Sequence, residues 1–175
     1  MSLTVAVFTG KNLDILEQEG GSGYWRAKKE RLLESEYALL VRNHRESWSI
    51  KNDGLEHGQA FFIGKISGCL EEYDNRKVIV FSEYALLPNQ EEFKNAWGKL
   101  TDGQRNPVAY LDTDTVASVL GLDFASMDWK PFIETSTIER WASEMNLEEA
   151  MQTAKKLVAK VAKVDVTQVN VQVNF

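Results

Sequence analysis

The side chains best suited to chemistry gather in one polar stretch, residues 42–58. This stretch contains cations, an amide, an indole and both histidines of the chain: Arg42, Asn43, His44, Arg45, Trp48 and His57. Arginine can hold a phosphate through two parallel hydrogen bonds, an asparagine amide can read a base edge, and an indole can stack on an unpaired base. The composition of the stretch therefore predicts a site for nucleic acid or for a single base.

The two histidines, His44 and His57, support a different interpretation, because imidazoles titrate near neutral pH and can serve as general acid and base. The protein would then be a hydrolase of the ribonuclease type. A metal site would need a carboxylate such as Glu56 or Glu83 beside them, but thirteen positions across a loop is not a typical ligand spacing. We therefore predict no metal centre and no cofactor, and we favour binding over catalysis.

A purely structural role for the same stretch is a further alternative. Arg42 and Arg45 could pair with surface carboxylates, while Trp48 could pack over the mouth of a barrel. Signature motifs of nucleotide-dependent enzymes and of serine hydrolases are absent, and Gly-Gly-Ser-Gly at 20–23 is typical of a linker. Cys69 is the only cysteine, which excludes an internal disulfide, and we expect an inert thiol there.

Composition places the chain among folded globular proteins. Its 175 residues are 43% hydrophobic and 26% charged, which is enough to bury a core without disulfides or metals. The formal charge of −6 argues against a broad basic surface for nucleic acid but leaves a local site open. No apolar run approaches the ~20 residues that span a bilayer, and no secretion signal is evident. We expect a cytoplasmic protein without membrane contact.

Hydrophobic patterning predicts the elements that must position the polar stretch. We expect residues 1–23 to form an appendage outside the main domain, ending in the Gly/Ser linker at 20–23. Four strands are expected, the middle two forming an antiparallel hairpin: 37–41, 59–66, 76–82 and 108–111. A short helix capped by Asp112 or Thr113 should end at Gly121.

The carboxyl-terminal region predicts a helix followed by a strand. Asn146 with Glu149 is similar to a capping box, and apolar residues at helical spacing continue to Val161. Valines then alternate with polar residues over 169–175, which predicts a half-buried strand. Because a helix and one strand cannot form a core alone, we expect this unit to dock on the main sheet or to pair with a second copy through the strand edge.

The segment from Trp25 to Phe132 resembles the PUA-like superfamily, in particular its EVE and ASCH domains. The similar features are Tyr24-Trp25, the strand with Arg-Asn at 37–43, the glycine-led strand at 57–65 and the stretch 97–108. Phe81 to Ala85 and the Arg-Asn-His-Arg-Glu loop also resemble uncharacterised bacterial proteins. The resemblance implies a pseudo-barrel with a cleft that binds RNA or a modified DNA base in relatives. Some ASCH proteins cleave RNA, but their Gly-x-Lys-x-x-Glu-x-Arg stretch is missing here.

These observations predict an α+β protein: a small PUA-like mixed β-barrel with short flanking helices over 24–133, preceded by the appendage 1–23 and followed by a helix-strand unit over 134–175. The loops at the strand ends should supply further ligand contacts from Glu83, Tyr84 and Asn106. We predict a non-enzymatic domain that binds RNA or DNA, single-stranded or with a modified base, through the 42–58 loop. The alternatives are a ribonuclease-type hydrolase and a dimeric interaction adaptor.

Overall fold

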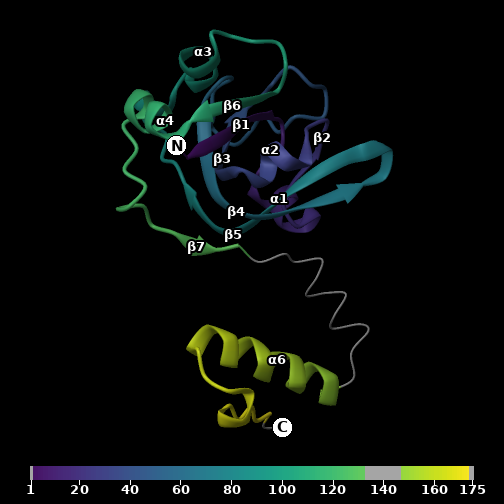
Figure 1. Ribbon diagram of the computed structural model, residues 1–175. Coiled ribbons are helices and arrows are strands. Elements are labelled where there is room, and N and C mark those ends of the chain that lie inside the picture. Colours follow the sequence, from purple (N-terminus) through teal and green to yellow (C-terminus); the bar gives the residue numbers. More distant parts are fainter. Residues whose placement is uncertain (1, 133–146, 174–175) are drawn as a thin grey trace. The chain divides into compact units, whose positions relative to one another are not determined.

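The computed structural model describes residues 2–132 and 147–173 (Figure 1). Backbone contacts divide the chain into two compact units, Met1–Glu134 and Thr135–Phe175, which are described separately. None of the helices among the described residues is long and apolar enough to cross a membrane.

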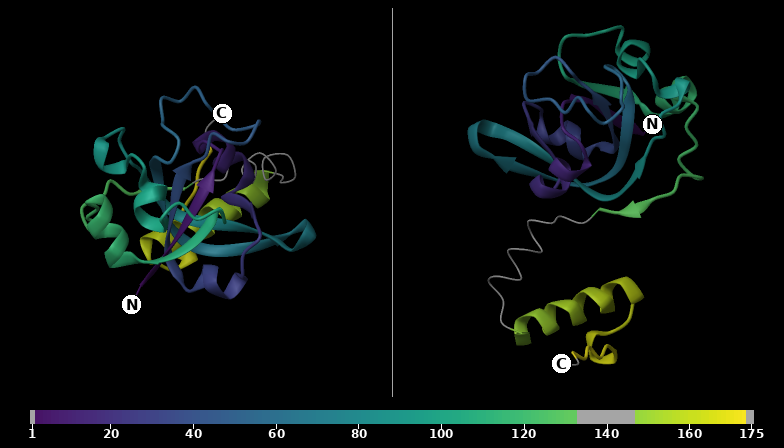
Figure 2. Two further views of the ribbon diagram at one scale, coloured as in Figure 1. Left: turned by 90° about the horizontal axis from the view of Figure 1, so that it is seen from above. Right: turned by 180° about the vertical axis from the view of Figure 1, so that it is seen from behind.

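A curled, half-barrel sheet forms the first unit (Figure 2). Its strands follow the order β2-β5-β4-β3-β1-β6, and β7 pairs with β5. The bounds are β1 (Leu3–Thr9), β2 (Ser22–Trp25), β3 (Ser35–Arg42), β4 (Ala60–Glu72), β5 (Arg76–Leu86), β6 (Val108–Asp112) and β7 (Lys130–Pro131). Neighbouring strands are antiparallel except β1 and β3, which run parallel. The far end of the β4–β5 hairpin projects from the rest of the unit (Figure 1).

Short helices connect the strands. They are α1 (Leu13–Glu19), α2 (Lys29–Leu33), α3 (Ala96–Thr101) and α4 (Thr113–Leu120), with 3-10 turns at η1 (Tyr73–Asn75) and η2 (Glu91–Phe93). The side chain of Asp112 accepts a hydrogen bond from the Thr115 amide at the start of α4, and Gly121 ends this helix in the left-handed conformation. Both ends of the predicted helix at 113–120 are therefore confirmed.

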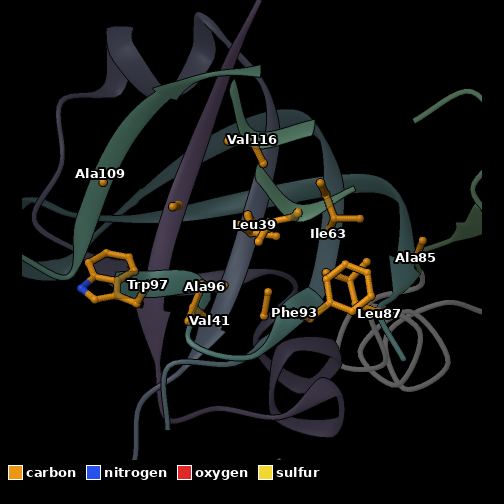
Figure 3. Close-up of a cluster of buried hydrophobic side chains, with 13 residues drawn as sticks. Leu39, Val41, Ile63, Ala85, Leu87, Phe93, Ala96, Trp97, Ala109 and Val116 are labelled. Atoms are coloured by element: carbon orange, nitrogen blue, oxygen red, sulfur yellow. The ribbon is translucent and has the colours of Figure 1, made fainter. Parts of the chain in front are cut away.

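Apolar side chains cover both faces of the sheet. Along β3, Leu39 and Val41 belong to one buried cluster, whereas Ala38 and Leu40 belong to the other. This arrangement explains the continuous apolar run of β3, since successive side chains of a strand point to opposite faces. Figure 3 shows the first cluster, which Trp97 closes at one end.

The α+β class and the four predicted strands are confirmed. The strands at 37–41, 59–66, 76–82 and 108–111 correspond to β3, β4, β5 and β6, and β4 and β5 form the expected antiparallel hairpin. The hairpin is longer than predicted because β4 continues through Glu72 to the η1 turn. The polar residues of this extension hide its strand character, which comes from pairing with β5 rather than from an apolar pattern.

The predicted appendage at 1–23 is wrong. Strand β1 lies inside the sheet, between β3 and β6, with Val5, Ala6 and Val7 fully buried. The supposed linker is also structured, because Gly20 ends α1 and residues 22–25 form β2 against β5. A side chain at Gly21 would meet the Ile79 carbonyl oxygen at 2.2 Å, so this glycine permits close packing rather than flexibility.

In the second unit, α6 (Leu147–Ala162) and the 3-10 turn η3 (Val166–Gln168) are described. The predicted helix is confirmed over this range, whereas Asn146 lies outside the described residues. The predicted strand at 169–175 is not found in its described part, 169–173. Alternation alone does not make a strand, because a ladder needs a partner and the described residues of this unit offer none. The expected contact with a second copy through this segment stays a prediction.

Two glycine substitutions test the packing of β2 on β5. Gly21 has φ +151° and no space for a side chain, whereas Gly54 has φ +74° and no atom within 4 Å of the place where a β-carbon would lie. We expect Gly21→Ala to lower the free energy of unfolding by about 2–3 kcal/mol and Gly54→Ala by only about 1 kcal/mol. Urea unfolding followed by tryptophan fluorescence measures both, and equal losses would contradict the close packing.

Candidate ligand-binding cleft

A cleft of about 510 Å³ opens where three segments of the first unit meet: the end of β1, the loop between β3 and β4, and the chain from η2 to β6. Its lining combines aromatic, cationic and amide side chains with glycine backbone: Phe8, Asn43, Arg45, Glu46, His57, Gly58, Asn95, Trp97, Gly98, Gly103, Gln104, Arg105 and Pro107. The volume falls in the ~300–1,000 Å³ range of small-molecule sites.

The sheet topology brings these segments together. Because β1 and β3 are parallel, their carboxyl ends lie side by side, with Thr9 paired to Arg42. Strand β6 runs antiparallel to β1, so its beginning lies at the same edge. Two backbone hydrogen bonds fix the junction: the Asn43 amide donates to the Thr9 carbonyl and the Phe8 amide to the Pro107 carbonyl, each at 2.8 Å.

Three rings form an aromatic wall in the cleft. Phe8 stacks on Trp97, with ring centroids 4.7 Å apart and planes 6° apart, and it meets His57 edge-on at 5.1 Å. Trp97 is only 5% exposed, and its indole N–H donates to the Gln104 carbonyl at 3.1 Å. The wall is therefore anchored in the core through Trp97, which Figure 3 labels within the buried cluster.

Arg42 does not reach the cleft, so the expectation that it takes phosphate is wrong. Its side chain is fully buried, where the guanidinium pairs with Asp53, donates to the Lys11 carbonyl at 2.8 Å and lies over the Phe61 ring at 4.4 Å. Burial lowers the pKa of Arg42 and the Asp53 carboxylate opposes this shift. Arg42 therefore attaches the 43–58 loop to the sheet.

Arg45 and Arg105 are the cations that the cleft presents. Both line it and are exposed, and neither has a carboxylate within 4 Å among the residues that the structure describes. The side-chain oxygen of Asn43 accepts a hydrogen bond from the backbone N–H of Arg45 at 2.9 Å. The side-chain NH2 group of Asn43 takes no part in this bond. Since Glu46 is the one carboxylate in the lining, the cleft carries a local positive charge in an acidic protein.

His57 has a defined protonation state. Its Nδ1 accepts a hydrogen bond from the His44 amide at 3.1 Å, so Nδ1 carries no proton and the neutral ring bears its proton on Nε2. Burial lowers the pKa of His57, and the positive charges of Arg45 and His44 lower it further. His57 is therefore neutral at pH 7.

The remaining predicted site residues lie elsewhere. Trp48 is 55% exposed and does not line the cleft, while the Asn106 side chain accepts from the Val108 amide at 3.2 Å and shapes the neighbouring turn. Glu83 pairs with Lys65 at 2.7 Å, and Tyr84 stacks on Phe62. Glu83 and Tyr84 are remote because β4 and β3 separate β5 from β1 in the sheet.

His44 and His57 are neighbours, with ring centroids 6.2 Å apart, but only His57 lines the cleft. Nε2 of His44 is buried without a hydrogen-bond partner in the described part of the chain. Two imidazoles facing one substrate, as a general acid–base pair requires, are thus not found here. No cluster of three or more potential metal ligands occurs within residues 2–132 and 147–173.

Sequence reasoning misses Phe8 as a cleft residue. The position of Phe8 depends on the parallel pairing of β1 with β3, which no local pattern reveals. Trp97 belongs to the 97–108 stretch of the resemblance, but nothing near it in the sequence identifies Phe8 as its stacking partner. The run Arg105-Asn106-Pro107 directly before a strand is the sequence signal that predicts a contribution from this part of the chain.

Comparisons with protein-family models, with curated proteins and with solved structures find no match to this chain. The PUA-like assignment therefore rests on the sequence features given above.

Substitution separates the roles of the two loop arginines. Arg42→Leu removes the pair with Asp53 and leaves the Lys11 carbonyl without its guanidinium donor, and we expect the free energy of unfolding to fall by about 2–3 kcal/mol. Arg45→Leu, at an exposed position without an ion pair among the described residues, should change it by less than about 0.5 kcal/mol. Urea unfolding at pH 7 compares them, and a large loss for Arg45→Leu would refute the assignment.

The pKa of His57 predicts a pH dependence of stability. This pKa lies below that of an unfolded histidine, ~6.5. As the pH falls, the unfolded state therefore binds more protons than the folded state. The stabilisation by neutral His57 is complete above pH 6.5 and is lost as the pH falls through its folded pKa. Wild type should lose more unfolding free energy than His57→Gln between pH 7.5 and 5.5. Similar losses would show that His57 is not the responsible group.

Proposed function

We propose that the chain is a non-enzymatic, PUA-like domain that binds single-stranded RNA or DNA and takes one base of the strand into the cleft. Arg45 and Arg105 contact the flanking phosphates, while Phe8 and Asn43 face the base. This proposal keeps the predicted loop as the binding element but moves phosphate contact from Arg42 to Arg105 and stacking away from Trp48.

The observation that carries the proposal is the pair of arginines without carboxylate partners at one cleft. In a chain of net charge −6, nearby carboxylates are available to pair with exposed cations, as Asp74 does with Arg26. Arg45 and Arg105 come from different loops, yet both line the cleft without such a partner among the described residues. Guanidinium groups at the rim of a partly aromatic cleft are suited to a ligand that combines a ring with phosphate.

The geometry favours binding over hydrolysis, because the cleft contains one histidine and no second acid or base opposite it except Glu46 among the described residues. Binding to a single strand needs only a cationic rim and a surface for the base. Cleavage of the oligonucleotides used below would revive the ribonuclease interpretation, and gel analysis after each binding experiment detects it.

Salt-dependent binding tests the proposal. Fluorescence anisotropy with labelled 12-nucleotide RNA and DNA measures affinity between 50 and 200 mM salt. Each phosphate contact on a single strand contributes about 0.7 to the slope of log affinity against log salt. We expect Arg45→Gln and Arg105→Gln each to weaken binding several-fold and to reduce the slope by about 0.7.

Arg26→Gln is the matched control, since it removes the same charge from an exposed arginine that does not line the cleft. We expect this variant to bind like wild type. The proposal fails if wild type does not bind any oligonucleotide at 50 mM salt. It also fails if Arg26→Gln weakens binding as much as the cleft variants do.

A further inference from the structure

Two contacts determine the orientation of the His57 ring in the cleft. The His44 amide donates to its Nδ1 at 3.1 Å, and the Phe8 ring meets it edge-on at 5.1 Å. These two contacts come from different segments, the 43–58 loop and the end of β1, so the imidazole cannot turn over without breaking one of them. A turned ring would also bring the Cδ2–H group against the His44 amide, which would then lose its acceptor.

The charges around His57 favour its neutral form. Arg45 is the cationic neighbour of the ring and His44 is its titratable neighbour, and Arg105 and Glu46 are the other ionisable groups of the cleft. The adjacent Glu56 is engaged elsewhere, because Lys94 holds its carboxylate at 2.9 Å. An imidazolium at this position would lose the hydrogen bond at Nδ1 and add a cation beside Arg45.

We propose that His57 is a specificity-determining residue of the cleft, in which the neutral ring donates one hydrogen bond from Nε2 to an uncharged acceptor, a carbonyl oxygen or ring nitrogen on the edge of the bound base. The inference rests on the proposed function and deepens it. Arginines select the phosphates by charge, whereas His57 selects the base by a donor of fixed direction.

Two substitutions separate this role from a structural one. In His57→Gln the side-chain amide nitrogen would reach the position of Nε2, so the variant keeps a donor for the ligand but loses the acceptor for the His44 amide. In His57→Asn the side-chain oxygen would reach the position of Nδ1, so the variant keeps the acceptor and loses the donor. If His57 acts as a donor to the ligand, glutamine should preserve binding. If its role is only to accept the hydrogen bond from the His44 amide, asparagine should preserve binding.

We expect His57→Gln to bind the 12-nucleotide strands within about 3-fold of wild type and His57→Asn to bind at least 10-fold more weakly at pH 7.5. The salt slope of both variants should equal that of wild type, because no charge is removed. The inference is overturned if His57→Asn binds as well as wild type, if the two variants lose affinity equally, or if the slope falls with either variant.

The pH dependence provides an independent check. If a cationic His57 contacted phosphate, affinity would fall by up to about tenfold for each pH unit above ~6.5. We expect affinity to stay constant between pH 7 and 8.5. Nitrogen NMR of the free protein should show the proton on Nε2 of His57, and a proton on Nδ1 would overturn the inference.

The two proposals fail in distinguishable ways. If wild type binds in an Arg45- and Arg105-dependent manner but His57→Asn is unaffected, the proposed function stands and the role of His57 is wrong. If wild type binds no oligonucleotide, both are wrong.

Discussion

The ion pair of the buried Arg42 with Asp53 is the interaction on which the site depends. Arg42 is the last residue of β3, and its guanidinium reaches Asp53 in the loop, the Lys11 carbonyl after β1 and the Phe61 ring in β4. One side chain thus joins the ends of three strands to the loop that carries the cleft residues. Because a buried charge is costly without its partner, the pair fixes where the loop begins and returns.

Local sequence patterns are sufficient to predict most of the strands, but they do not predict how the strands are arranged in the sheet. The apolar runs of β3 and β4 and the capped helix α4 can be predicted because each is specified by residues close in sequence. Strand β1 has equally clear strand character, yet the glycines at 20–23 suggest separation from the domain. In the fold these glycines allow a turn and a close approach to β5, and this distinction depends on tertiary packing.

The candidate site is predictable only in part. Arg42 and Arg45 are indistinguishable as residue types, but Arg42 ends a buried strand and Arg45 lies three residues farther into the loop, so one is a structural anchor and the other faces the cleft. Glu83 and Tyr84 belong to a strand whose end could have met the site, but the strand order places β5 away from the cleft edge. The order in which the strands pair, rather than the composition of their ends, decides which side chains lie together at the cleft.

Strand β1 has a consequence for synthesis of the protein. Its neighbours β3 and β6 come later in the chain, and the hydroxyls of Thr4 and Thr113, 3.0 Å apart in the fold, are separated by 109 positions. Because β3 precedes β6 in the chain, β1 can pair along one edge first, and its other edge stays unpaired until β6 has been made.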